Sequence, residues 1–160
     1  MANEFVLRTG IKLLGTTQSV GTYSLYINPT TGLVSYSTAS TAGNIGAFGI
    51  TVDGAGTALT TGSKGYVNMP YNGYITSWAM VANAASTIIL DLKKSTYSDF
   101  PTTTSITGAN YITMSSVVKN NSSVLTSWSL TFSTGDIYEF VINSASTATR
   151  INVTINTNKT

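Results

Sequence analysis

The sequence contains no cysteine and no histidine among its 160 residues. These absences exclude disulfide bonds, cysteine or histidine catalysis, and zinc or haem ligation by either side chain. Charged residues are scarce as well, at 9% of the chain, where about 25% is usual. The basic residues are scattered and the net charge is only +2, so we expect no nucleic-acid partner.

Long apolar runs are also missing. Stretches such as Ile88–Leu90 are far shorter than the roughly 20 apolar residues that span a membrane. At the N-terminus, Glu4 precedes a short apolar stretch, and no long apolar core of a signal peptide follows. We therefore expect a soluble protein without a membrane segment, made in a cytoplasm and able to leave the cell within a larger particle.

Hydroxyl and amide side chains replace the missing charges, with 48 Ser and Thr and 13 Asn residues. Hydrophobic residues still make up 42% of the chain and aromatic residues 10%, which is enough apolar surface for a core. β-Branched and aromatic residues gather in short segments between turn residues, and this pattern predicts an all-β protein.

Apolar and polar residues alternate with period two in several segments, which is typical of antiparallel sheets with one face on a core. The rows expected to face inward are Ile88, Leu90, Leu92; Trp128, Leu130, Phe132; Tyr138, Phe140, Ile142; and Ile151, Val153, Ile155. The expected strands are 65–69, 73–82, 87–93, 111–117, 127–132, 136–143 and 148–156. Their number and spacing predict an antiparallel β-sandwich over residues 61–160.

Residues 1–60 have a different character. Short strands are expected at 5–7 and 11–14, followed by a hairpin of 22–27 and 33–37 around an Asn-Pro-Thr-Thr-Gly turn. Glycines are dense from residue 38 to 63, which indicates either a linker or backbone that packs closely on a partner. Because a lone hairpin is only marginally stable in water, we expect an attachment segment that is protease-sensitive until it lies against a partner.

The acidic residues do not predict a catalytic pair. Asp136 and Glu139 are the closest two, but residues three apart on a strand point to opposite faces, and Asp136 after Gly135 is typical of a turn. The motifs Gly54-Ala55-Gly56 and Gly62-Ser63-Lys64 lack the strand–helix context of a phosphate-binding loop. With no catalytic carboxylate pair, no histidine or cysteine and no calcium-loop series, we expect no enzyme activity, cofactor or metal.

Four aromatic residues, Tyr66, Tyr71, Tyr74 and Trp78, lie close together in the sequence. They are candidates for stacking on a sugar, but aromatic residues at alternating strand positions more often pack in a core or at a subunit interface. We favour packing and keep ligand binding as the alternative.

Several strand and turn motifs from Thr61 onward resemble those of a domain found in virion proteins of tailed bacteriophages. They are the runs Lys64-Gly65-Tyr66-Val67, Gly73-Tyr74-Ile75 with Trp78, Ile89 to Tyr97 with Phe100-Pro101, Ser105-Ile106-Thr107-Gly108, Leu125 to Trp128, Gly135-Asp136 to Phe140, and Ser144 to Arg150. The hairpin around Asn28-Pro29 is similar to short attachment segments of such proteins.

This resemblance implies a jelly-roll-like sandwich on a head fibre, tail fibre or capsid decoration. The N-terminal segment would anchor the protein to a capsid or tail component, and the location would be the virion. The alternative is a receptor-binding module of a tail fibre that recognises host-surface carbohydrate.

Self-association is expected on physical grounds. A monomeric domain normally keeps itself soluble with far more charged residues, interspersed over its surface. The alternation places Ile89, Ile137 and Val141 on outward faces, so we expect them near a subunit interface. Closed cyclic symmetry is usual for such assemblies, and a trimer is expected first and a dimer second.

Overall fold

The computed structural model describes residues 44–160 without a gap, together with two earlier strands and Thr30. The chain forms two compact units, Met1–Thr41 and Ala42–Thr160. In the first unit, β1 (Tyr23–Ile27) and β2 (Val34–Thr38) pair antiparallel with Ile27 opposite Val34, which confirms the predicted hairpin. The strands expected at 5–7 and 11–14 lie outside the described residues.

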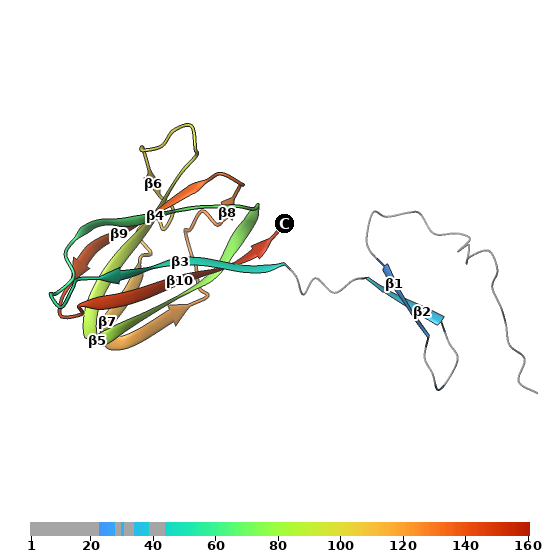
Figure 1. Ribbon diagram of the computed structural model, residues 1–160, viewed down its shortest axis with the longest axis horizontal. Helices are drawn as coiled ribbons and strands as arrows, with labels where there is room; N and C mark the ends of the chain where they lie inside the picture. The colour runs from blue at the N-terminus through green and yellow to red at the C-terminus, as the bar shows by residue number, and fades with distance from the viewer. Residues whose placement is uncertain (1–22, 28–29, 31–33, 39–43) are drawn as a thin grey trace, which may run out of the picture. The chain divides into compact units, whose positions relative to one another are not determined.

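The second unit is built from eight strand segments (Figure 1). They are β3 (Ile45–Asp53), β4 (Gly62–Asn68), β5 (Gly73–Ser95), β6 (Thr104–Ser105), β7 (Ile112–Ser122), β8 (Thr131–Phe132), β9 (Ile137–Ala145) and β10 (Arg150–Lys159). Every pairing is antiparallel, and the described part of the chain contains no helix. The predicted all-β antiparallel class is confirmed.

Two long strands, β5 and β7, run through both layers of a sandwich. In one layer the order is β3, β10, the first part of β5 and the last part of β7. In the other layer the order is β4, β9, the last part of β5 and the first part of β7. With the halves of β5 and β7 counted separately, these are the two four-stranded layers of a jelly roll.

The continuity of β5 differs from the prediction of two strands, 73–82 and 87–93. The register with β7 shifts between Val81 and Ser86, so the strand turns from one layer into the other without ending. The expected strand 127–132 is largely a loop, because the backbone N–H of Trp128 bonds to Leu125 O in a turn. Only Thr131 and Phe132 pair as β8.

The predicted linker is wrong for residues 45–53. These residues form β3, which pairs with β10 from Asp53 opposite Arg150 to Ile45 opposite Asn158. Gly49 lies so close to β10 that a Cβ there would overlap the carbonyl oxygen of Val153. Glycine is needed here for close packing of two backbones, and the folded unit begins at Ala42 instead of residue 61.

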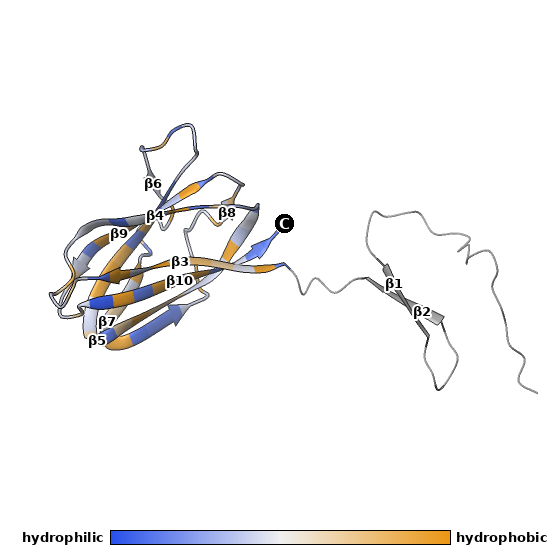
Figure 2. Cartoon of the chain, viewed as in Figure 1, coloured by the Kyte–Doolittle hydropathy of each residue, from blue (hydrophilic) through white to orange (hydrophobic). Residues whose placement is uncertain are grey.

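The core lies between the two layers. The rows Ile88, Leu90, Leu92; Tyr138, Phe140, Ile142; and Ile151, Val153, Ile155 are all buried, as predicted. Figure 2 shows the corresponding alternation of apolar and polar residues along β10. Phe48 of β3 packs on Tyr138 of β9 with ring centroids 4.7 Å apart, which joins the two layers. Trp128 and Phe132 are buried in the same core, whereas Leu130 is half-buried.

Candidate functional site

The four aromatic residues selected from the sequence do not form one surface. Trp78 is buried in the core. The Tyr71 ring packs on Phe132 at 5.7 Å, and its hydroxyl lies 3.0 Å from Thr157 Oγ1. Tyr74 is exposed and accepts a hydrogen bond from Asn158 Nδ2 at 3.0 Å. Only Tyr66 combines high exposure, at 52%, with a second exposed aromatic neighbour.

That neighbour is Phe100. The two rings meet edge to face with centroids 5.2 Å apart and planes at 90°. Phe100 belongs to the β5–β6 loop, which extends away from the sandwich at the top of Figure 1 and also carries the exposed Tyr97. The sequence showed Phe100-Pro101 as a motif, but nothing in its spacing indicated that the loop returns to Tyr66.

A row of polar and charged side chains begins at Tyr66 and runs across three neighbouring strands. Tyr66 of β4 lies opposite Glu139 of β9, and Glu139 lies opposite Lys93 of β5. Tyr138 and Phe140 point into the core, so the intervening Glu139 points outward. The Tyr66 hydroxyl donates to Glu139 Oε1 at 3.4 Å, and Thr103 Oγ1 donates to Oε2 at 2.5 Å.

The Glu139 carboxylate is held in its charged form. Partial burial raises its pKa, but hydrogen bonds from Thr103 and Ser63, the nearby Lys93 and the Tyr66 hydroxyl together hold the pKa below its usual value. The arrangement thus places two exposed aromatic rings beside an oriented anion. Such a surface has the groups to bind a small ligand.

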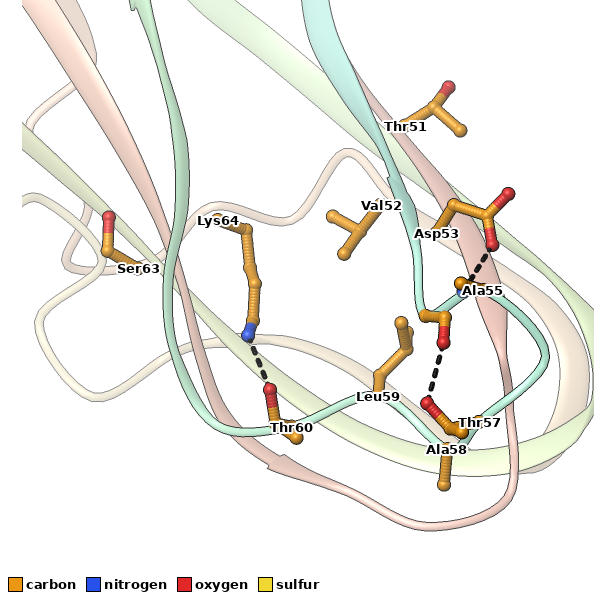
Figure 3. A pocket seen from close by; sticks show the side chains of 11 residues that line it. Thr51, Val52, Asp53, Ala55, Thr57, Ala58, Leu59, Thr60, Ser63 and Lys64 are labelled. Atoms are coloured by element: carbon orange, nitrogen blue, oxygen red, sulfur yellow. Dashed lines mark hydrogen bonds between the residues drawn. The ribbon is translucent and has the colours of Figure 1, made fainter.

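A hollow lies beside the β3–β4 loop (Figure 3). Asp53 and Lys64 lie on its opposite sides with Val52 and Leu59 between them. Lys64 Nζ donates to Thr60 Oγ1 at 3.0 Å and to Thr61 O at 3.2 Å.

Asp53 on the far rim is equally well satisfied. Its carboxylate accepts the backbone N–H of Ala55 at 2.9 Å and the Arg150 guanidinium at 2.7 Å, and both lower its pKa. Because the charged groups at the hollow already have partners in the protein, they support the loop and form no reactive pair.

The two buried aspartates have structural partners. Asp136 accepts the Ser133 N–H at 3.0 Å and pairs with Lys94 Nζ at 3.1 Å, which confirms its expected turn role. Asp91 accepts the hydroxyls of Ser105 at 2.7 Å and Thr107 at 2.8 Å. Within residues 44–160 and the two hairpin strands, no group of three or more potential metal-ligating side chains occurs.

The expected interface residues need one correction. Ile137 is buried, at 8% exposure, although the alternation placed it on an outward face. Ile89 and Val141 are half-buried on outward faces. The strongly exposed aliphatic residues of β5, β7 and the following loop are instead Val81, Val117, Val118 and Val124.

No family model, curated protein or solved structure matches this chain. The resemblance to phage virion proteins therefore stays a prediction. In the part of the chain that the structure describes, no helix is long and apolar enough to cross a membrane.

Proposed function

We propose that the protein is a structural component of a tailed-phage virion, a fibre or decoration protein that projects its sandwich outward. The observation that carries this proposal is a jelly-roll unit with its own core, preceded by a separate hairpin unit. Jelly rolls recur in viral capsid proteins and in lectins, and this recurrence supports a role as a particle component.

The use of the charged residues supports assembly over catalysis. Asp53, Asp91 and Asp136 each have partners that stabilise a turn, a loop or a strand end. An active site would instead need such a group left free beside a second reactive group in a cleft. We see no such pair among the described residues.

The N-terminal unit is proposed as the anchor to a capsid or tail component. A two-stranded hairpin cannot bury its side chains alone and gains stability by packing on another surface. The protein itself is proposed to form a homo-oligomer, with a trimer first and a dimer second. The interface is assigned to the exposed valines Val81, Val117, Val118 and Val124 of β5, β7 and the following loop.

Density-gradient purification of particles from cells that carry this coding sequence tests the proposal. We expect the full chain to migrate with the particles and a chain starting at Ala42 to remain in the soluble fraction, because it lacks the anchor. A full-length chain that never migrates with particles contradicts the virion role. Equal incorporation of both chains contradicts the anchor only.

A second function, recognition of host-surface carbohydrate, is favoured by one observation. Tyr66 and Phe100 form an exposed aromatic pair beside the charged Glu139. Fibre proteins can combine both functions, so the second does not compete with the first.

A further inference from the structure

We propose that Tyr66, Phe100 and Glu139 form a subsite for one uncharged sugar ring at the β4 edge of the sandwich. The proposal rests on the second function above and adds the residues and the ligand class. It is independent of where the protein sits in a particle.

The aromatic pair supplies the apolar contact. Tyr66 is 52% exposed and Phe100 38% exposed, so each ring keeps free surface for a ligand. Because the rings stand at 90°, they present two walls, and the C–H face of a sugar ring can lie against one of them. Tyr97, on the same loop, is 76% exposed.

The loop that carries Phe100 is ordered by its own hydrogen bonds. Thr96 Oγ1 donates to Asp99 Oδ2 at 2.7 Å, and the N–H of Phe100 donates to Thr96 O at 3.2 Å. A second turn follows, in which the N–H of Thr102 donates to Asp99 O at 2.9 Å. The ring is thus positioned before a ligand arrives, which lowers the entropic cost of binding.

Glu139 supplies the polar contact. Thr103 donates to Oε2 at 2.5 Å, the Tyr66 hydroxyl makes a long hydrogen bond to Oε1 at 3.4 Å, and Ser63 is a third donor. A carboxylate has about four acceptor positions, so Glu139 keeps capacity for a ligand hydroxyl. Hydrogen bonds to a charged acceptor are stronger than those between neutral groups.

The position of Lys93 beside Glu139 favours an uncharged ligand. It lies directly opposite Glu139 on β5 and is near enough to lower the pKa of that carboxyl. A quaternary ammonium ligand would otherwise suit an aromatic pair beside a carboxylate, but here it would meet a second cation. An acidic sugar would meet Glu139. A neutral hexose or N-acetylhexosamine avoids both repulsions.

The test uses the full-length protein on an array of immobilised neutral and sialylated oligosaccharides, followed by titration calorimetry with the best neutral hit and with choline chloride. We expect neutral glycans to bind with Kd values of roughly micromolar to millimolar. Tyr66→Ala, Phe100→Ala and Glu139→Gln should each weaken binding about tenfold or more, which is about 1.4 kcal/mol. Tyr66→Phe keeps the ring and should retain most of the affinity.

Tyr74→Ala is the matched control, because Tyr74 is an exposed tyrosine on β5 that pairs with Asn158 and lies outside the subsite. Neutral binding that survives Tyr66→Ala in a folded variant overturns the subsite but leaves carbohydrate recognition standing. Binding of choline or only of sialylated glycans overturns the ligand class. No binding to any glycan overturns both this subsite and the second function, while the virion role stays open to its own test.

Discussion

Ser86 occupies the bend of β5 and illustrates how hydroxyl groups serve this protein in place of charges. The side chain is buried, accepts the N–H groups of Thr147 and Ala148 at 3.3 and 3.2 Å, and bonds to Ser146 Oγ at 3.0 Å. The side-chain oxygen of Asn83 likewise accepts hydrogen bonds from the backbone N–H groups of Thr149 and Arg150. The side chains of Ser86 and Asn83 therefore accept the backbone N–H groups of residues 147–150.

Replacing Ser86 with Ala should lower the free energy of unfolding by about 1–3 kcal/mol, because the buried N–H of Ala148 and the partly buried N–H of Thr147 lose their acceptor. Denaturant unfolding measures the change. Ser123→Ala, in the exposed loop after β7, is the control and should stay within about 0.5 kcal/mol of the parent. An unchanged stability of Ser86→Ala would mean that this corner does not depend on the hydroxyl.

Glu139 predicts an acid-dependent loss of stability. Its pKa is below the ordinary value in the folded protein, so the unfolded chain binds the proton more readily. The group therefore stabilises the fold above the unfolded pKa and loses this contribution as the pH falls through the folded pKa. Thermal midpoints between about pH 6 and pH 3 should fall less in Glu139→Gln than in the parent. Parallel pH profiles would contradict the assigned hydrogen bonds.

At the level of single residues, period-two alternation predicted the core rows of β5, β9 and β10, because each of these strands has one face on the core. The same alternation placed Ile137 outward but failed to predict its burial. Phe100 could not be placed beside Tyr66 from the sequence, because the contact depends on the path of a long loop. Local pattern predicts which face a residue takes, and tertiary structure decides what covers it.

Among the strands, β3 departs most from the sequence prediction. Its glycines suggested a flexible linker, yet β3 supplies Phe48, Ile50 and Val52 to the core or its margin. A glycine required by close backbone approach and a glycine in a linker look alike in sequence. The sequence pattern likewise predicted two strands in place of the long β5. The hydrogen bonds that stabilise its bend come from residues 146–148, far away in the sequence, so the local pattern could not indicate that the strand continues.

Truncated chains distinguish the observed start of the folded unit, Ala42, from the predicted start at Thr61. A chain starting at Ala42 keeps β3 and should unfold cooperatively with a midpoint close to that of the full-length protein. A chain starting at Thr61 loses Phe48 and uncovers one edge of β10, so it should be strongly destabilised or should lack a cooperative transition. Circular dichroism melts measure both. Equal midpoints for the two chains would show that β3 is dispensable.

Over the whole molecule, charge scarcity and the exposed valines of β5, β7 and the following loop predict a homo-oligomer. Light scattering with in-line size separation should give a mass near three times 16.8 kDa, or near twice 16.8 kDa for a dimer. The double variant Val81→Glu with Val118→Glu should shift the protein to monomer, because it buries two unpaired charges. Thr61→Glu, in the exposed β3–β4 loop, should leave the mass unchanged. A monodisperse parent monomer at tens of micromolar would contradict self-association.

The central claim, membership of a virion, is tested most directly by quantitative mass spectrometry of gradient-purified particles from cells that carry this coding sequence. We expect peptides of this chain at a constant, multi-copy ratio to the most abundant particle protein across the particle peak. Recovery at less than one copy per particle, or only from the soluble fraction, would contradict it.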